Sequence, residues 1–247
     1  MTDTVHLLKD SARQTADRMI SLIYPLRCPV CDRPVRPYGE DICLPCMKRL
    51  KALKSPFCER CGKKISAPSG ICTDCSRNDH VFTRCRSAFE YDTVRAAIYR
   101  FKYLGRREYA YVFAEMTHRI LADYLVGIRP DAITFVPLSR EKERTRGYNQ
   151  ARDYAGELSK LMNIPLLDDA LIRVRNTAPM KLLTPQERLK NLKNAFKSGQ
   201  NVVKSKSILL VDDIYTTGAT MDECARVLFD AGADKVYCVT LASGKGV

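Results

Sequence analysis

Apolar residues after position 80 recur in short blocks that alternate between strand-like and helical spacing. Strands are predicted for the apolar, β-branched runs 81–91, 133–138, 207–211 and 236–242. The helical spacing of apolar residues predicts helices over 94–101, 108–126, 150–161 and 220–231. Strands and helices alternate in this way in proteins built on a parallel sheet, so this part of the chain is predicted to be an α/β domain.

The first 80 residues have a different pattern. Apolar residues from His6 to Tyr24 recur at helical spacing and predict an amphipathic helix that ends before Pro25. The segment from Cys28 to Cys75 is rich in proline, glycine and lysine and poor in aliphatic residues, so it needs metal to hold it together. We therefore predict two domains, 1–80 and 81–247.

A further helix start is predicted at Thr184. Thr184 would be the N-cap, Pro185 would occupy the first helical position, and Glu187 would complete a capping box. No internal repeat is found beyond the cysteine pairs.

Eight of the eleven cysteines form four CxxC pairs, separated by 11, 11 and 10 residues. Two such knuckles complete the four-thiolate shell of a structural zinc site, so two zinc ions are predicted. The predicted ligands are Cys28, Cys31, Cys43, Cys46, Cys58, Cys61, Cys72 and Cys75.

Sequential pairing of the knuckles closes the shortest loops and is preferred, while interleaved pairing stays open. The alternative of redox-active thiols is disfavoured because the region does not resemble a thioredoxin-like βαβ unit. Cys85, Cys224 and Cys238 lie on strand or helix patterns and are predicted to be ordinary buried residues.

The segment ILLVDDIYTTGAT, residues 208–220, has the chemistry of a phosphate-binding loop. An apolar strand ends in Asp212 and Asp213, and a hydroxyl- and glycine-bearing turn then leads into a helix. Carboxylates suit ribose hydroxyls or Mg²⁺, whereas hydroxyls and free N–H groups at a helix start suit phosphate. The predicted phosphate ligands are Thr216, Thr217, Gly218 and Thr220. The alternative is that these residues only cap the helix, but a helix cap would not need two acids, three threonines and a glycine.

This segment resembles the PRPP (phosphoribosyl pyrophosphate) signature of type I phosphoribosyltransferases. Tyr215 replaces the usual small aliphatic residue and precedes the phosphate cup, so little consequence is expected from it. The stretch FVPLSREKERTRGYNQA, residues 135–151, resembles the pyrophosphate loop and following helix of the ComF competence family. Further short motifs occur in the same order along the chain as in that family: CPVC, FKYLG, RVRNT and ERLKNLKNAF. The resemblance covers residues 22–241, approximately. Met180 stands where the family typically has glutamine.

The resemblance implies a type I phosphoribosyltransferase-like parallel sheet flanked by helices, behind an N-terminal double zinc ribbon. It implies catalytic roles for Asp212 and Asp213, with PRPP and Mg²⁺ as ligands. It also implies that Arg140, Arg144 and Arg146 hold pyrophosphate oxygens. The alternative without a binding role is that these arginines belong to a solvated loop of mixed charge. Lys102 in FKYLG is a weaker candidate, because a lysine extending from a helix end explains it equally well.

The formal net charge is +13, and residues 140–206 carry 15 basic and 7 acidic residues, a net +8. This excess indicates either a polyanionic partner or solubility. Tryptophan is absent and the other aromatic residues are scattered, so the sequence pattern does not indicate a surface on which bases stack. No apolar run is long enough for a membrane span, and the N-terminus does not resemble a secretory signal. The predicted compartment is the cytoplasm.

Three functions from different classes remain. One is a PRPP-dependent phosphoribosyltransferase with an unidentified small-molecule acceptor in nucleotide metabolism. The second is a protein that handles single-stranded DNA during DNA uptake in natural transformation, with a ComFA-type helicase as partner. The third is a structural adaptor. The resemblance implies the second function, with the first as its molecular activity.

Overall fold

The computed structural model describes residues 25–35, 40–66, 70–175, 192–199 and 206–244. The predicted helix over 6–24, the predicted helix start at Thr184, and Met180 lie outside these ranges. Contacts divide the chain into two compact units, Met1–Arg49 and Leu50–Val247, and each is described by itself. The predicted boundary near residue 80 does not coincide with this division and remains a prediction about the modules of the chain.

The smaller unit is organised around its cysteines. Its short helix α2, Leu44–Met47, begins directly after Cys43 and carries Cys46. The opposite knuckle is closed by hydrogen bonds from Cys28 N to Arg33 O (2.9 Å) and from Asp32 N to Cys28 O (2.7 Å). The cysteine side chains thus take the place of an apolar core in this unit.

The larger unit is built on a parallel four-stranded sheet in the order β1-β6-β5-β2. The strands are β1, Arg84–Glu90; β2, Ala132–Phe135; β5, Ser207–Tyr215; and β6, Lys235–Ser243. All four predicted strands are therefore confirmed, and so is the α/β fold. The two central strands are almost entirely buried, which explains their continuous apolar runs.

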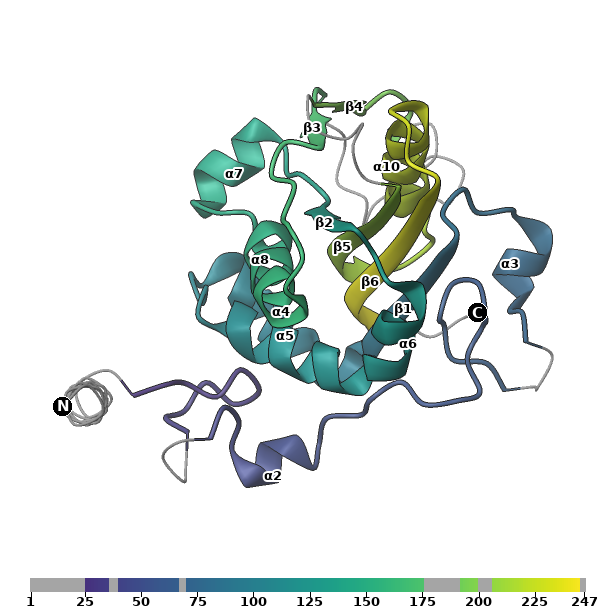
Figure 1. The fold of residues 1–247 in the computed structure, drawn as a ribbon. Coiled ribbons are helices and arrows are strands. Elements are labelled where there is room, and N and C mark those ends of the chain that lie inside the picture. The colour runs from purple at the N-terminus through teal and green to yellow at the C-terminus, as the bar shows by residue number, and fades with distance from the viewer. Residues whose placement is uncertain (1–24, 36–39, 67–69, 176–191, 200–205, 245–247) are drawn as a thin grey trace, which may run out of the picture. The chain divides into compact units, whose positions relative to one another are not determined.

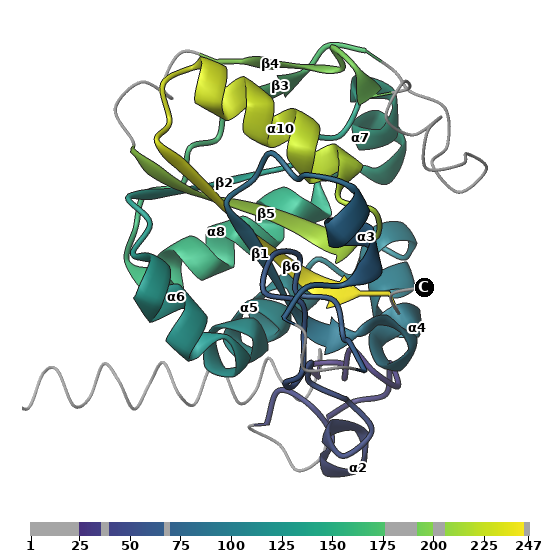
Figure 2. The same cartoon turned by 90° about the vertical axis from the view of Figure 1, so that its right-hand side faces the viewer.

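Helices cover both faces of this sheet (Figures 1 and 2). On one face lie α4, Tyr91–Tyr103; α5, Tyr109–Ile120; and α8, Gln150–Met162. On the other face lies α10, Ala219–Asp230, which packs on β6. Beside α10 lies an antiparallel hairpin of β3, Leu171–Arg173, and β4, Phe196–Ser198. The three cysteines outside the CxxC pairs are fully buried, as predicted.

The single helix predicted over 108–126 is wrong, because the chain turns at Leu121. There the backbone leaves the helical region (φ −104°, ψ 20°), and a second helix, α6, Ala122–Ile128, begins. The turn lets Tyr124 Oη donate to Arg84 O (3.0 Å) on β1. Sequence periodicity missed this break because the apolar spacing continues through it.

The edge of β1 is covered by residues 51–62. Leu53 N donates to Ala88 O (2.9 Å), and Cys85 N donates to Arg60 O (2.8 Å). Gly62 has φ +73°, and a Cβ there would lie 2.8 Å from Cys85 O. Only glycine allows this close approach, so the knuckle that begins at Cys58 protects an edge that would otherwise be open to pairing.

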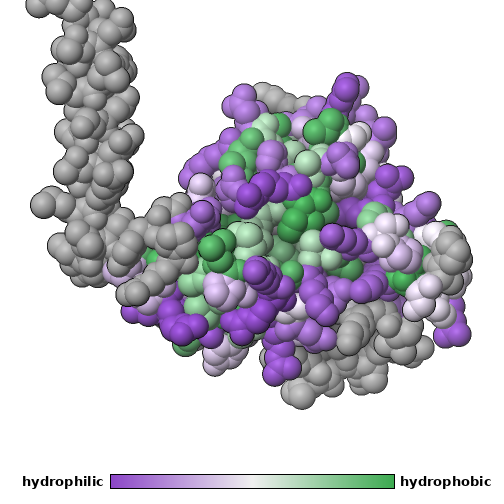
Figure 3. Space-filling view, turned by 90° about the horizontal axis from the view of Figure 1, so that it is seen from below, coloured by the Kyte–Doolittle hydropathy of each residue, from purple (hydrophilic) through white to green (hydrophobic). Residues whose placement is uncertain are grey.

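Within the described ranges, no helix combines the length and apolar character needed to cross a membrane. Seen from below, the molecule has an apolar area bordered on several sides by hydrophilic residues (Figure 3).

Candidate functional site

The predicted phosphate loop lies at the carboxyl end of β5. β5 carries Asp212 and Asp213, and Gly218 is the N-cap of α10. Gly218 has φ +83°, and no described side chain caps the helix start. The N–H groups of the first turn of α10 are thus open to an anion, with Thr216 exposed and Thr217 and Thr220 half-buried around them.

Asp213 is fixed by two side chains from different helices. Lys102 Nζ on α4 lies 2.7 Å from Asp213 Oδ2, and Gln150 Nε2 on α8 donates to the same oxygen at 2.8 Å. Burial alone would lower the pKa of Lys102, but the Asp213 carboxylate outweighs it and raises that pKa. Lys102 is therefore a member of the site and not a solvated helix-end lysine.

Asp212 is in a different electrostatic state. Burial, followed by repulsion from the Asp213 carboxylate, raises the pKa of Asp212 to about 7. Its Oδ1 accepts a hydrogen bond from Asp213 N at 2.8 Å. An acid with such a pKa is poised to lose its proton when a cation arrives.

The loop after β2 lies next to these acids, because Val136 N donates to Val211 O at 3.0 Å. Asn149 holds this loop: its Nδ2 donates to Val136 O (3.2 Å), while its Oδ1 caps α8 by accepting from Ala151 N (2.9 Å). The residues before Asn149 form helix α7, Arg140–Arg146, which begins at the N-cap Ser139. The segment is thus a helix and not a loop, but none of its residues is buried, so the solvated, charge-mixed character of the alternative remains.

The three predicted arginines fall in different places. Arg146 donates to Gln150 Oε1, and its guanidinium lies 5.0 Å from the centroid of the Tyr103 ring. Arg146 is thus connected to Asp213 through Gln150. Arg140 and Arg144 are exposed on α7, and their contact with pyrophosphate stays a prediction.

Two further basic side chains lie near the site. The charge of Arg173 on β3 partly offsets the raised pKa of Asp212, while burial lowers the pKa of Arg173 itself. Partial burial, and then repulsion from Arg173 and Arg146, lower the pKa of Lys142. Lys102 and Arg173 thus act directly on the carboxylates, and Arg146 and Lys142 add positive charge beside these two cations, an arrangement that attracts a polyanion. Arg173 opens the RVRNT segment noted in the sequence, but nothing local to that segment indicated that it would approach Asp212.

Behind the phosphate loop lies a buried chain of hydrogen bonds. Tyr215 Oη lies 3.1 Å from His80 Nε2, and His80 Nδ1 lies 2.8 Å from Asp222 Oδ2 in the first turn of α10. A Cβ on Gly218 would lie 2.6 Å from Tyr215 Oη and 2.7 Å from His80 Cε1. Tyr215 therefore shapes the back of the cup, contrary to the expectation that it matters little. His80 was missed because it lies 142 residues from Asp222.

The eight paired cysteines form two four-thiol clusters. Within each, all sulfur atoms lie within 4.8 Å of one another, and the pairing is sequential, as predicted. Sulfur atoms lie 3.6 Å apart for Cys61 and Cys72 and 4.0 Å apart for Cys31 and Cys43. A tetrahedron with Zn–S bonds of about 2.3 Å has edges of about 3.8 Å, so the spacing fits zinc.

The electrostatics of the clusters agree with this geometry. Burial raises the pKa of Cys75 to about 12 and that of Cys46 to about 11. Burial acts in the same direction on one other thiol in each cluster, Cys31 and Cys58, but hydrogen bonds outweigh it and lower the pKa of each to about 6. One thiolate per cluster therefore forms readily, whereas ionising its neighbours as well requires a cation between them. The two clusters are thus consistent with two structural zinc sites.

The second cluster belongs to the larger unit and shares its core. Its four cysteines join one buried cluster with Phe82, Tyr215 and Met221. Lys63, next to this cluster, forms an ion pair with Asp74 (2.6 Å) and lies 5.8 Å from the Tyr215 ring centroid. The second zinc site is therefore in physical contact with the back of the phosphate loop.

Known families match both parts of the chain. The double zinc ribbon domain matches residues 19–76, and the phosphoribosyl transferase domain matches residues 145–246. Competence protein ComFC of Bacillus subtilis is 30% identical over 206 residues, which cover 78% of this chain and 80% of that protein. The chain belongs to the ComF family.

Other relatives of this ComF chain align over nearly their whole length. Competence protein F of Haemophilus influenzae is 29% identical over 232 residues, 89% of this chain and 97% of the relative. DNA utilization protein YhgH of Escherichia coli K12 is 28% identical over 227 residues, 88% of this chain and 98% of the relative. The ComF chain thus combines a double zinc ribbon with a phosphoribosyltransferase domain.

Proposed function

We propose that this protein binds PRPP with Mg²⁺ at the carboxyl end of β5 and handles single-stranded DNA during DNA uptake in natural transformation. The observation that carries the PRPP part is the pair Asp212 and Asp213, which lies next to Lys102 and Arg173 and beside an uncapped helix start. The relatives' names, two competence proteins and a DNA utilization protein, support the DNA part.

In this proposal each part of the site takes a different group of PRPP. The hydroxyls of Thr216, Thr217 and Thr220 and the N–H groups after Gly218 bind the 5′-phosphate. Asp213, oriented by Lys102 and Gln150, accepts hydrogen bonds from the ribose diol.

The pyrophosphate lies among the basic side chains. Arg146, at the end of α7, and Arg173, on the hairpin, reach it, with Arg140 and Arg144 of α7 extending the positive surface. Mg²⁺ bound here supplies positive charge to the pyrophosphate oxygens. Asp212, with a pKa of about 7, would release its proton to solvent, and the resulting carboxylate would help to hold that cation.

A second candidate function is enzymatic transfer of the phosphoribosyl group to a small-molecule acceptor in nucleotide metabolism. It is favoured by a cavity of about 820 Å³ that is lined by Lys102 and Ile214 and so adjoins the acids. In that reaction the C–O bond to pyrophosphate breaks, the acceptor forms the new bond at the same carbon, and the two carboxylates stabilise the positive sugar.

The proposal also includes a cytoplasmic location and a ComFA-type helicase as partner. Reduced thiols support the location, because eight of them are arranged as metal ligands. The helicase is carried over from the family resemblance.

A calorimetric titration with PRPP and Mg²⁺, with and without single-stranded DNA, tests the proposal. We expect saturable PRPP binding that needs Mg²⁺ and is lost in Thr217→Val. Pyrophosphate release that depends on an added nucleobase, and not on DNA, would favour the enzymatic alternative. An absence of PRPP binding at millimolar concentration would contradict both.

A further inference from the structure

The exposed face of α4 carries a row of aromatic and basic side chains. Tyr91, Arg95, Tyr99 and Tyr103 follow one another at intervals of four residues, so they share one side of the helix. The opposite side, with Val94, Ala97, Ile98 and Phe101, is buried in the core. At 1.5 Å per residue the row is about 18 Å long, enough for a few stacked bases.

Two of the three tyrosines in this row are open to solvent, whereas Tyr91 is half-buried. Tyr99 is 57% exposed and Tyr103 is 53% exposed, although a tyrosine ring on a protein surface normally covers apolar neighbours. Their ring centroids lie 5.1 Å apart, with an angle of 46° between the planes. Two adjacent, tilted and accessible rings form a platform for flat ligands.

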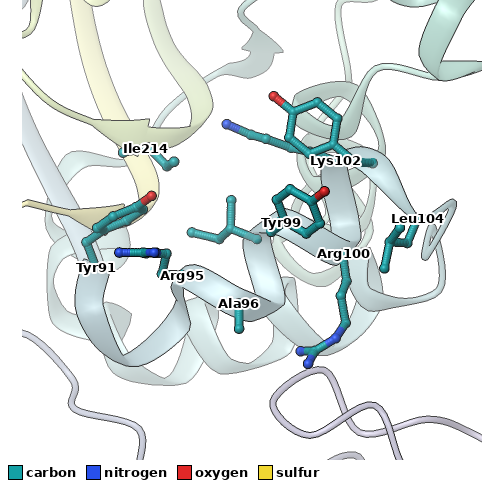
Figure 4. A pocket seen from close by; sticks show the side chains of 10 residues that line it. Tyr91, Arg95, Ala96, Tyr99, Arg100, Lys102, Leu104 and Ile214 are labelled. Carbon is teal, nitrogen blue, oxygen red and sulfur yellow. The ribbon is translucent and has the colours of Figure 1, made fainter. Parts of the chain in front are cut away.

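The row borders the cavity of about 820 Å³ described above (Figure 4). Three of the ten residues that line it are basic and none is acidic. In Figure 4, Arg95 points toward Tyr91, and Arg100 points away from the cavity. Arg146 adds a guanidinium 5.0 Å from the Tyr103 ring centroid. Aromatic rings on a cationic background are the pattern by which proteins hold single strands without sequence preference.

The cavity also leads to the PRPP site. Lys102 and Ile214 both line the cavity. Lys102, which precedes Tyr103 on α4, forms an ion pair with Asp213, and Ile214 follows Asp213 on β5. A ligand laid along α4 therefore passes directly beside the two carboxylates.

We propose that this face of α4 is the docking surface for single-stranded DNA, with bases stacked on Tyr99 and Tyr103 and a phosphate next to Arg95. This inference rests on the proposed function and gives it a place: the strand runs past the PRPP site and not over the exposed arginines of α7. The aromatic residues look scattered in the sequence because these tyrosines are four positions apart, and only the helix places them side by side.

Fluorescence anisotropy of a labelled oligothymidylate tests the inference. Stacking on one aromatic ring is worth about 1–3 kcal/mol, so Tyr99→Ser should weaken binding by about 5- to 150-fold. Tyr99→Phe keeps the ring and should bind within about twofold of the wild type. Tyr111, an exposed tyrosine on α5, provides the matched control Tyr111→Ser, which should leave binding unchanged. Arg95→Gln should reduce the log–log salt slope by about 0.7.

Two further measurements separate this inference from the proposed function. An oligonucleotide carrying 5-iododeoxyuridine should crosslink to the peptide 91–103. PRPP with Mg²⁺ should stabilise Tyr99→Ser as much as the wild type, because Tyr99 does not touch the acids.

The inference is overturned if Tyr99→Ser binds DNA like the wild type, or if crosslinks map elsewhere. It is also overturned if Tyr99→Ser only disrupts self-association, which would assign α4 to a second copy of the chain. Loss of PRPP stabilisation in the wild type would refute the proposed function independently.

Discussion

Asp212 provides the most specific prediction about the electrostatics of the site. In the ligand-free protein its pKa is raised from 3.8 to about 7, with burial as the main cause and the Asp213 carboxylate as the second. Replacing Asp212 with Asn removes the charge at nearly constant shape. We expect the variant to be more stable than the wild type without ligand and yet unable to respond to PRPP with Mg²⁺.

The sign of the effect follows from proton linkage. Between pH 4 and pH 7 the unfolded chain has lost the Asp212 proton while the folded protein still holds it. The wild type therefore loses stability as pH rises through this window. One pKa unit corresponds to about 1.4 kcal/mol, so the penalty at pH 8 is on the order of 4 kcal/mol. This is an upper bound, because local rearrangement and water relieve part of it.

Urea unfolding of both proteins at pH 5 and pH 8 measures this directly. The difference in free energy of unfolding between Asp212→Asn and the wild type should increase from pH 5 to pH 8. For the control Asp230→Asn, on the exposed end of α10, the same difference should change by about zero. In the wild type, Mg²⁺-dependent PRPP affinity should rise through about pH 7, because the cation needs the carboxylate. Parallel pH profiles for Asp212→Asn and wild type would refute the argument.

Three further predictions concern the zinc sites, the basic surface and the loop. Elemental analysis should find two zinc ions per chain, and Cys28→Ser and Cys58→Ser should each lose one. Only Cys58→Ser should lower the unfolding temperature of the larger unit, whose core its cluster shares, so equal effects would contradict that coupling. Because the proposed strand runs along α4, replacing both Arg140 and Arg144 with Gln should leave the log–log salt slope of DNA binding unchanged, and a slope reduced by about 1.4 would place the DNA on α7 instead. Gly218→Ala should weaken PRPP binding at least tenfold in calorimetry, because its Cβ collides with Tyr215 and His80; wild-type affinity would show that the cup tolerates the shift.

Local patterns predicted most of the sheet and the zinc clusters. The central strands β5 and β6 are largely apolar because they are buried on both faces, and the CxxC knuckles are recognisable because their spacing is set by coordination. The acid pair and the glycine turn of residues 212–218 are contiguous, so their grouping was readable as well. In each case the signal lies within one short, contiguous stretch of the chain.

The parts that were missed depend on contacts between distant segments. His80 meets Asp222 only after the second zinc knuckle packs on β1, and Arg173 reaches Asp212 only through the hairpin. Lys102 could not be distinguished from a solvated lysine until α4 placed it 2.7 Å from Asp213. The turn at Leu121 is hidden because both helices keep the same apolar spacing.

The central claim is that PRPP with Mg²⁺ binds at Asp212, Asp213 and the loop that follows. Its most direct test is the melting temperature of the wild type with and without millimolar PRPP and Mg²⁺. A ligand at a hundredfold excess over its dissociation constant stabilises the folded state by about 2.7 kcal/mol, or roughly 5–10 °C for a domain of this size. We predict this shift for the wild type and for Asp230→Asn, and its loss in Asp213→Asn and Thr217→Val, with both variants folded at 25 °C. A wild type that shows no shift at millimolar PRPP would contradict the claim and leave only the fold in common with phosphoribosyltransferases.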